Sequence, residues 1–351
     1  MPRFIGSRFG DFVGVNTVSG FCDSGVYNYN DQTFLNEAGA WQGFSASGGL
    51  ESTPGNGYKY HTFLASGSFV VQGSVHPVGM EVLVIGGGGG GGEGTVGQGG
   101  GGAGGFRVQG GPGVVGSTGT HGPATPLTIP VGTTTITVGE GGGVGQNGEN
   151  SSIGSLLVAT GGGSGGRTEN TPTFSGSSGG SSGGASNTES SAPTNGNAGG
   201  FSPFPEGNNG GGSAGGVSSE GGGGGGGAGA NGQPSPGNAT AGSGGHGLQM
   251  PLYAIPLLHP DASPLSPHNN YYAGGGGGGT IRNPTGGATG GDGGGGTGGS
   301  CNPPVGGVTQ VATAGANNTG SGGGGGSIES LAPTGNSAPG GDGIVIIRYT
   351  V

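Results

Sequence analysis

"MEVLVIGGGGGGGEG", residues 80–94, joins a strand-like apolar stretch to seven consecutive glycines. A similar junction returns in reverse at the end of the chain, where "GGDGIVIIRYTV" occupies residues 340–351. Glycine loses more backbone freedom on folding than any other residue, so a glycine run would ordinarily act as a flexible tether. The recurrence leaves two interpretations open. Either the glycines link folded fragments, or they form the structure themselves.

The composition makes disorder the first alternative to consider. Glycine supplies 105 of the 351 residues, proline supplies 23, and charged residues make up only 7%. Such a share of glycine and proline without a fixed period is typical of low-complexity chains. Disordered chains, however, usually stay solvated through charge, and here 7 basic and 17 acidic residues are spread thinly.

The charge balance excludes one class of partner. A net charge of -10 and a pI near 4.8 argue against nucleic acid, because phosphate binding needs clustered lysine and arginine. No window approaches the roughly 20 apolar residues of a membrane span, and "MPRFIGSRFG" lacks the apolar core of a signal peptide. We therefore expect assembly in a cytoplasm. Cys22 and Cys301 are expected to be unpaired thiols.

The strand patterns predict an all-β or irregular fold with no substantial α-helix. Residues 1–79 hold the single tryptophan and many of the aromatic residues, and we predict that they form a β-rich N-terminal module for attachment or oligomerisation. Residues 80–351 form the second predicted domain. Its first part alternates β-branched residues in "TPLTIPVGTTTITVGEGG", which is typical of half-buried strands. The terminal "GIVIIRYTV" predicts a closing strand that holds the intervening segments inside one domain.

The glycine tracts admit three physical interpretations. Collagen is excluded, because strict Gly-X-Y repeats are absent, whereas a random-coil linker remains possible. The third is a bundle of polyproline II helices, whose amides bond to neighbouring strands because the helix has no internal hydrogen bonds. A Cβ atom that points toward a neighbouring helix would prevent the two helices from approaching closely enough for these bonds. The proposed structural tracts run from Gly86 to Gly92, Gly221 to Gly227, Gly274 to Gly279 and Gly322 to Gly326.

The order of the tracts resembles a known family. "MEVLVIGGGGGGGEG", "TITVGEGGGVG", "EGGGGGGGAGANG", "YYAGGGGGGT" and the closing "GGDGIVIIRY" are similar to the glycine-rich domain of tailed-bacteriophage fibre and adhesin proteins, frequent in phages of marine bacteria and cyanobacteria. The resemblance covers roughly residues 75–351. It implies a sandwich of stacked polyproline II helices flanked by β-strands, with loops between the tracts exposed at one end. Residues 25–41 also resemble an N-terminal module of marine-phage virion proteins, which implies a virion anchor or an oligomerising segment.

Bulky side chains in the insertions between tracts are the candidates for recognition, since loops on a scaffold commonly carry function. An exposed set would form a binding patch, whereas folding back as a local plug or packing on a partner subunit is the alternative. The candidates lie in residues 248–272 and 201–207: Met250, Tyr253, Ile255, Leu258, His259, His268, Tyr271, Tyr272, Phe201 and Phe204.

Catalytic and metal sites are not expected. Matches to GxGxxG are inevitable in such a sequence, and no Gly-Lys-Ser/Thr motif is present. His246, His259 and His268 have irregular spacing for metal ligands, and we predict no metal and no cofactor. A pair of catalytic carboxylates cannot be chosen among 17 scattered acidic residues.

These observations lead to a functional hypothesis. We expect a non-enzymatic phage structural protein, a tail fibre or fibre-tip adhesin located in the virion, that binds a host glycan or outer-membrane protein through loops. Other virion proteins would contact the N-terminal module, and a homotrimer is expected by analogy with fibres. A capsid or neck decoration protein is one alternative. An ice-binding protein is another, and it would require a flat face of regularly repeated small residues.

Overall fold

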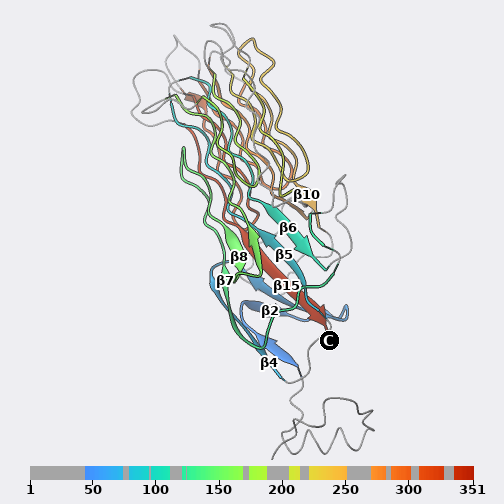
Figure 1. Cartoon of the computed structure of the whole chain (residues 1–351). Coiled ribbons are helices and arrows are strands. Elements are labelled where there is room, and N and C mark those ends of the chain that lie inside the picture. Colours follow the sequence, from blue (N-terminus) through green and yellow to red (C-terminus); the bar gives the residue numbers. More distant parts are fainter. Residues whose placement is uncertain are drawn as a thin grey trace, which may run out of the picture.

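A computed structural model describes residues 44–73, 79–94, 96–110, 121–123, 125–168, 174–187, 205–213, 221–250, 270–281, 286–301, 308–327 and 336–351. Within these residues the protein is all-β and contains no helix, as the sequence predicted. Extended tracts rise from two β-sheets at one end of the molecule (Figure 1). The strands are β1 (Ser45–Ser47), β2 (Leu50–Ser52), β3 (Tyr58–Phe63), β4 (Gly67–Gln72), β5 (Glu81–Ile85), β6 (Phe106–Gln109), β7 (Gly132–Thr137), β8 (Ser151–Ile153), β9 (Leu157–Ala159), β10 (Leu248–Gln249), β11 (Tyr271–Tyr272), β12 (Thr280–Ile281), β13 (Ser300–Cys301), β14 (Val308–Gln310) and β15 (Ile344–Thr350).

Two five-stranded antiparallel sheets form the base of the molecule. The first has the strand order β1-β4-β7-β8-β9, and the second has the order β2-β3-β15-β5-β6. The last strand, β15, is the central strand of its sheet, with Ile346 opposite Thr62 of β3 on one side and Leu83 of β5 on the other. Its run of β-branched residues suits a strand buried on both faces. The closing segment of the chain therefore joins the segments that precede the first glycine tract.

The described part of the predicted N-terminal module belongs to these same sheets. β3 pairs with β15, and β4 pairs with β7, so both strands lie beside strands of the predicted second domain. Residues 1–43, which hold most of the predicted module, lie outside the described residues.

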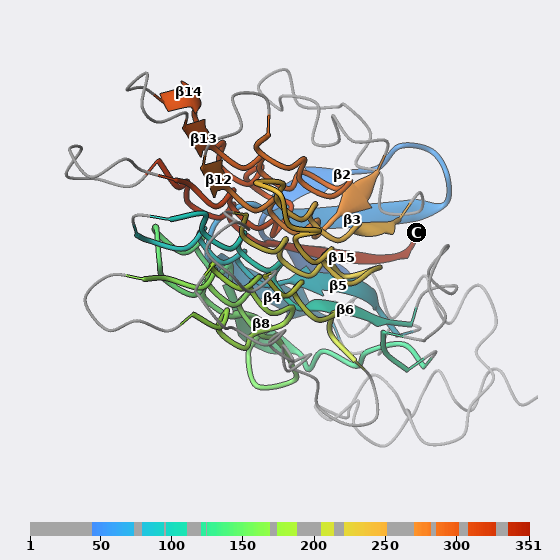
Figure 2. The ribbon, with the colours of Figure 1, turned by 90° about the horizontal axis from the view of Figure 1, so that it is seen from above.

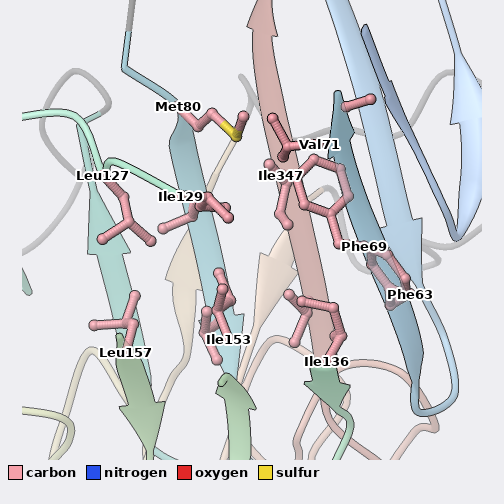
Figure 3. Packing of buried hydrophobic residues seen from close by; sticks show 14 of the residues in the cluster. Phe63, Phe69, Val71, Met80, Leu127, Ile129, Ile136, Ile153, Leu157 and Ile347 are labelled. Carbon is pink, nitrogen blue, oxygen red and sulfur yellow. The ribbon is translucent and has the colours of Figure 1, made fainter. Parts of the chain in front are cut away.

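The main hydrophobic core fills the space between the two sheets (Figure 3). Phe63 of β3 and Phe69 of β4 come from different sheets and meet edge to face, with ring centroids 6.4 Å apart. Because side chains alternate across a strand, every second residue of β5 and β15 points into this core. The cluster is made up of Ala46, Phe63, Phe69, Val71, Met80, Val82, Val84, Leu127, Ile129, Ile136, Val138, Ile153, Leu157, Ala159, Val345, Ile347 and Tyr349.

The opposite face of the second sheet is covered as well. The remaining residues of β5 and β15, such as Leu83 and Ile346, pack there with Phe106 of β6. Their partners come from the lower ends of the tracts and from the small β10–β11 sheet, and include Ala228, Leu248, Met250, Tyr272 and Ala273. This second core joins the sheets to the bundle.

The glycine tracts bond to one another with a three-residue period. Successive N–H groups of residues 86–92 donate to three neighbouring segments in rotation, and every third residue returns to the same neighbour. The donor–acceptor pairs, all at 2.8 to 3.0 Å, are Gly86 with Gly105, Gly89 with Gly102 and Gly92 with Gly99; Gly87 with Glu149 and Gly90 with Gln146; Gly88 with Gly341 and Gly91 with Ala338. Polyproline II helices have three residues per turn and no internal hydrogen bonds, so the tracts bond in the manner of packed polyproline II helices.

The Cα atoms of the same tract face three further neighbours. A Cβ atom added at any residue from Gly86 to Gly92 would lie 1.8 to 2.4 Å from a backbone oxygen of the segments 140–143, 160–166 or 321–324. With three neighbours met through its amides and three through its Cα atoms, the tract is surrounded by six others. No residue except glycine fits at any of these seven positions.

Four other tracts occupy equivalent interior positions, visible among the packed coils in Figure 2. All of the glycines expected to be structural in the tracts 86–92, 221–227, 274–279 and 322–326 are buried, and each Cβ position in them lies within 2.5 Å of a neighbouring backbone atom. The tract 98–105 is interior as well, and it contains Ala103 where the second hydrophobic core begins. Outer tracts instead place one residue in three toward solvent, as the exposed Glu140 and Gly143 illustrate.

Candidate recognition surface at the tip of the bundle

The tracts end together at the side of the bundle far from the sheets, which we call the tip. Three successive hydrogen bonds place four tracts at the same level there: Gly222 N donates to Gly279 O, Gly279 N to Gln98 O, and Gln98 N to Gly326 O, each at 2.9 Å. At the other end, Ala228 and Ala273 are paired next to the sheet. Within the described residues, the chain turns between tracts at the tip at residues 144–145 and 237–240.

Polar side chains fix the described backbone of the tip. The fully buried Gln98 donates from Nε2 to the carbonyl of Val96 at 2.6 Å and to Thr168 Oγ1 at 3.4 Å. Thr168 in turn donates its amide to the carbonyl of Glu93. Gly94, between them, has a φ of 149°, and a Cβ there would lie 2.0 Å from Thr168 Oγ1. Only glycine allows this turn.

Similar bonds connect other segments of the tip. The Thr280 hydroxyl donates to the carbonyl of Ala239 at 2.6 Å, and the Gly326 amide donates to Ser337 Oγ at 2.7 Å. Ser337 also donates to the carbonyl of Gly92. These contacts connect segments far apart in sequence and make the tip a fixed platform.

Among the described residues, three buried oxygens at the tip have no hydrogen-bond partner: Gln98 Oε1, Asn187 Oδ1 and Ser327 Oγ. Their tracts are laterally adjacent, since Asn187 N donates to the carbonyl of Gly97, and Gln98 N donates to Gly326 beside Ser327. Buried polar atoms without partners are rare in folded proteins. Within the described bundle, the side-chain oxygens without partners are therefore found at the tip.

The predicted recognition residues fall into two groups. Tyr253, Ile255, Leu258, His259, His268, Phe201 and Phe204 lie outside the described residues. Met250 and Tyr272 are 2% and 0% exposed, and Tyr271 is half-buried. Burial raises the pKa of Tyr272 to about 12, since the charged phenolate is disfavoured away from water.

The burial of Met250 and Tyr272 leaves neither side chain at the surface of the described structure. Both belong to the second hydrophobic core, and the pairing of Leu248 with Tyr272 places both ends of the insertion at the sheet end. The insertion thus leaves the bundle opposite the tip. The alternation of apolar Leu248, polar Gln249 and apolar Met250 is the sequence signal that indicates a strand here.

The described residues contain no group of three or more His, Cys, Asp or Glu side chains that could hold a metal ion. His246 Nδ1 lies 3.2 Å from Asp292 Oδ2, but both side chains are about two-thirds exposed, at 65% and 68%. The buried titratable groups have structural partners instead. Glu206 is paired with Arg107 at 3.2 Å and accepts the Thr160 amide at 3.0 Å. The described tip also carries charged side chains, since a Cβ at Gly145 would lie 3.5 Å from Glu93 Oε2 and 3.9 Å from Arg167 Nη1.

The fold and the tip together define an all-β sandwich that carries a packed bundle of glycine tracts. A family model of the glycine-rich domain matches residues 62–350, and the chain belongs to that family. A search of curated proteins gives no match. The match begins within β3, so it includes strands on both sides of the predicted boundary at residue 79. Among the described residues there is no helix with the length and apolar character needed to cross a membrane.

Proposed function

We propose that this protein is a structural protein of a tailed-phage particle, a tail fibre or fibre-tip adhesin that binds the bacterial surface through the tip. The observation that carries the proposal is that the described ends of several tracts lie level with one another at one end of a rigid bundle, remote from the sheets. Loops held by a rigid scaffold can vary in sequence without disturbing the fold, and such loops commonly carry binding function. The resemblance of the tract order to phage fibre domains supplies the biological setting.

The mechanism is multivalent binding without catalysis. Interior tracts with six neighbours hold the scaffold rigid, so little of the scaffold needs to be ordered on binding. A small loss of conformational entropy on binding favours high affinity. Several copies of the protein in one particle raise the avidity further. Phe44, the first described residue, packs against the core between the two sheets, and we assign attachment to other virion proteins to residues 1–43.

A binding assay with loop replacements tests the proposal. Fluorescently labelled full-length protein is mixed with bacterial cells of a panel of candidate hosts, and retained fluorescence is measured after washing. Replacing residues 214–220 or 282–285 with glycine and serine should abolish retention on the cells that bind the unchanged protein. Leu156→Ser in the exposed turn between β8 and β9, at the sheet end, is the matched control and should leave retention unchanged. Retention that survives both loop replacements would contradict binding by the tip.

A further inference from the structure

A buried histidine, His61, forms a hydrogen bond with the segment in which the chain crosses between the two sheets. β1 belongs to the first sheet and β2 to the second, and Gly48 and Gly49 make the crossing with φ values of 121° and 66°. His61 of β3 is 0% exposed, and its Nδ1 lies 2.8 Å from the carbonyl of Gly48. Because a carbonyl only accepts, Nδ1 carries the proton and donates it to Gly48.

The other side of the ring is also held. Nε2, unprotonated in this tautomer, accepts the Tyr349 hydroxyl at 3.2 Å, and the two rings are stacked with centroids 5.6 Å apart. Phe69 of β4 covers the imidazole edge to face at 5.0 Å. A neutral imidazole satisfies both polar contacts within this aromatic enclosure. An imidazolium in the same enclosure would carry a positive charge buried away from water, which is unfavourable.

Of the two charged groups near the ring, Glu51 offsets part of that cost, whereas Lys59 adds to it and lowers the pKa of His61. Glu51 of β2 has its Oε1 3.8 Å from Nδ1, but it is engaged by Lys59 of β3 at 2.7 Å, and β15 and β4 contribute the neutral Tyr349 and Phe69. Burial is the largest influence and lowers the pKa of His61, while the Gly48 contact and Glu51 act in the opposite direction.

We propose that protonation of His61 releases the β1–β2 crossing from the sandwich, which makes this crossing an acid-sensitive joint between the preceding residues of the chain and the glycine-rich domain. Opening exposes the imidazole to water, where it protonates near its ordinary pKa of 6.5. In the released state the His61 imidazole therefore binds a proton that it does not bind in the closed state. The rest of β3 stays in the sheet through its pairing with β15.

Amide hydrogen exchange on the full chain tests this proposal, with exchange corrected for the intrinsic effect of pH. Between pH 7.5 and pH 5.0 the opening constant of residues 44–52 should rise by up to about 30-fold, the factor expected when a group of ordinary pKa 6.5 protonates only in the open state. Residues 81–85 and 344–350, in the centre of the second sheet, should keep their protection. Equal protection of residues 44–52 at the two pH values in the unchanged protein would by itself overturn the proposal.

Two variants separate His61 from other acid effects. His61→Gln cannot titrate, so its residues 44–52 should exchange equally at both pH values, whatever its overall stability. His246→Gln removes a histidine that is 65% exposed and should keep the full response of the unchanged protein. Persistence of the acid response in His61→Gln, or its loss in His246→Gln, would assign the response to another group and overturn the proposal.

Discussion

At the scale of single residues, the bundle distinguishes glycines by their position among neighbouring tracts. Gly224 lies in the centre of an interior tract, and a Cβ added there would lie 2.0 Å from the carbonyl oxygen of Ser243. Gly143 lies on an outer tract, and its Cβ would meet only Gln146 Cγ, at 4.0 Å. The two residues share a chemical type but differ in what surrounds them.

Gly224→Val should destabilise the protein by at least about 3 kcal/mol, the upper part of the range for overpacking, because backbone rather than a side chain must move. Gly143→Ala should change stability by less than about 1 kcal/mol and in the stabilising direction, since it reduces the freedom of the unfolded chain without strain. Chemical denaturation of both variants measures the difference. Equal stability of Gly224→Val and the unchanged protein would show that the tract is a flexible linker.

Glu206 supports a second residue-level prediction. Its carboxylate is fully buried and bonds Arg107 of β6 and the amide of Thr160, at the point where tracts meet the sheets. Glu206→Gln leaves the Arg107 charge without its partner, and removing one partner of a buried pair costs about 3 kcal/mol or more. Lys59→Gln breaks the partly exposed pair with Glu51 and should cost at most about 1 kcal/mol. Denaturation curves that rank these two variants in the opposite order would contradict the structural role of Glu206.

At the scale of elements, β15 is the strand on which the second sheet depends. It pairs with β3 and β5 on its two sides and contributes residues to both hydrophobic cores. Deleting residues 344–351 should therefore abolish cooperative unfolding, measured by circular dichroism during heating. Deletion of the exposed Val351 alone is the control and should leave the transition unchanged. A cooperative transition in the longer deletion would place the folding core elsewhere.

The sequence was sufficient to predict the strands next to the first and last tracts, because "MEVLVI" and "GIVIIRY" contain β-branched runs bounded by glycine. It could not supply their partners. Alternation defines the two faces of a strand but not which strand lies beside it, so the pairing of β15 with β3 was not predicted. An interior tract of seven glycines has no side chains. Its sequence therefore does not indicate to which neighbouring tract each amide donates its hydrogen bond. The burial of Tyr272 was missed for a related reason, since aromatic residues suit a core and a binding patch equally.

At the scale of the whole molecule, two kinds of interior are combined. The sandwich buries apolar side chains from both sheets, whereas the bundle buries backbone amides and carbonyls that bond between tracts. The second hydrophobic core joins the two, with Ala103, Ala228 and Ala273 occupying positions where the tracts reach the sheet. The bundle is therefore anchored by ordinary hydrophobic packing at one end only, and its stability elsewhere depends on hydrogen bonds and close backbone contact.

This division predicts an unusual heat capacity of unfolding. Exposure of apolar surface raises the heat capacity and exposure of polar surface lowers it, with a net change near 12 to 15 cal/mol/K per residue in ordinary globular proteins. Unfolding the bundle exposes mainly peptide groups, since 105 of 351 residues are glycine. We expect the heat capacity change of unfolding of the whole protein to be below about 10 cal/mol/K per residue when measured by scanning calorimetry. A value in the ordinary range would mean that unfolding exposes far more apolar surface than the two hydrophobic cores contain, and would contradict this division of the interior.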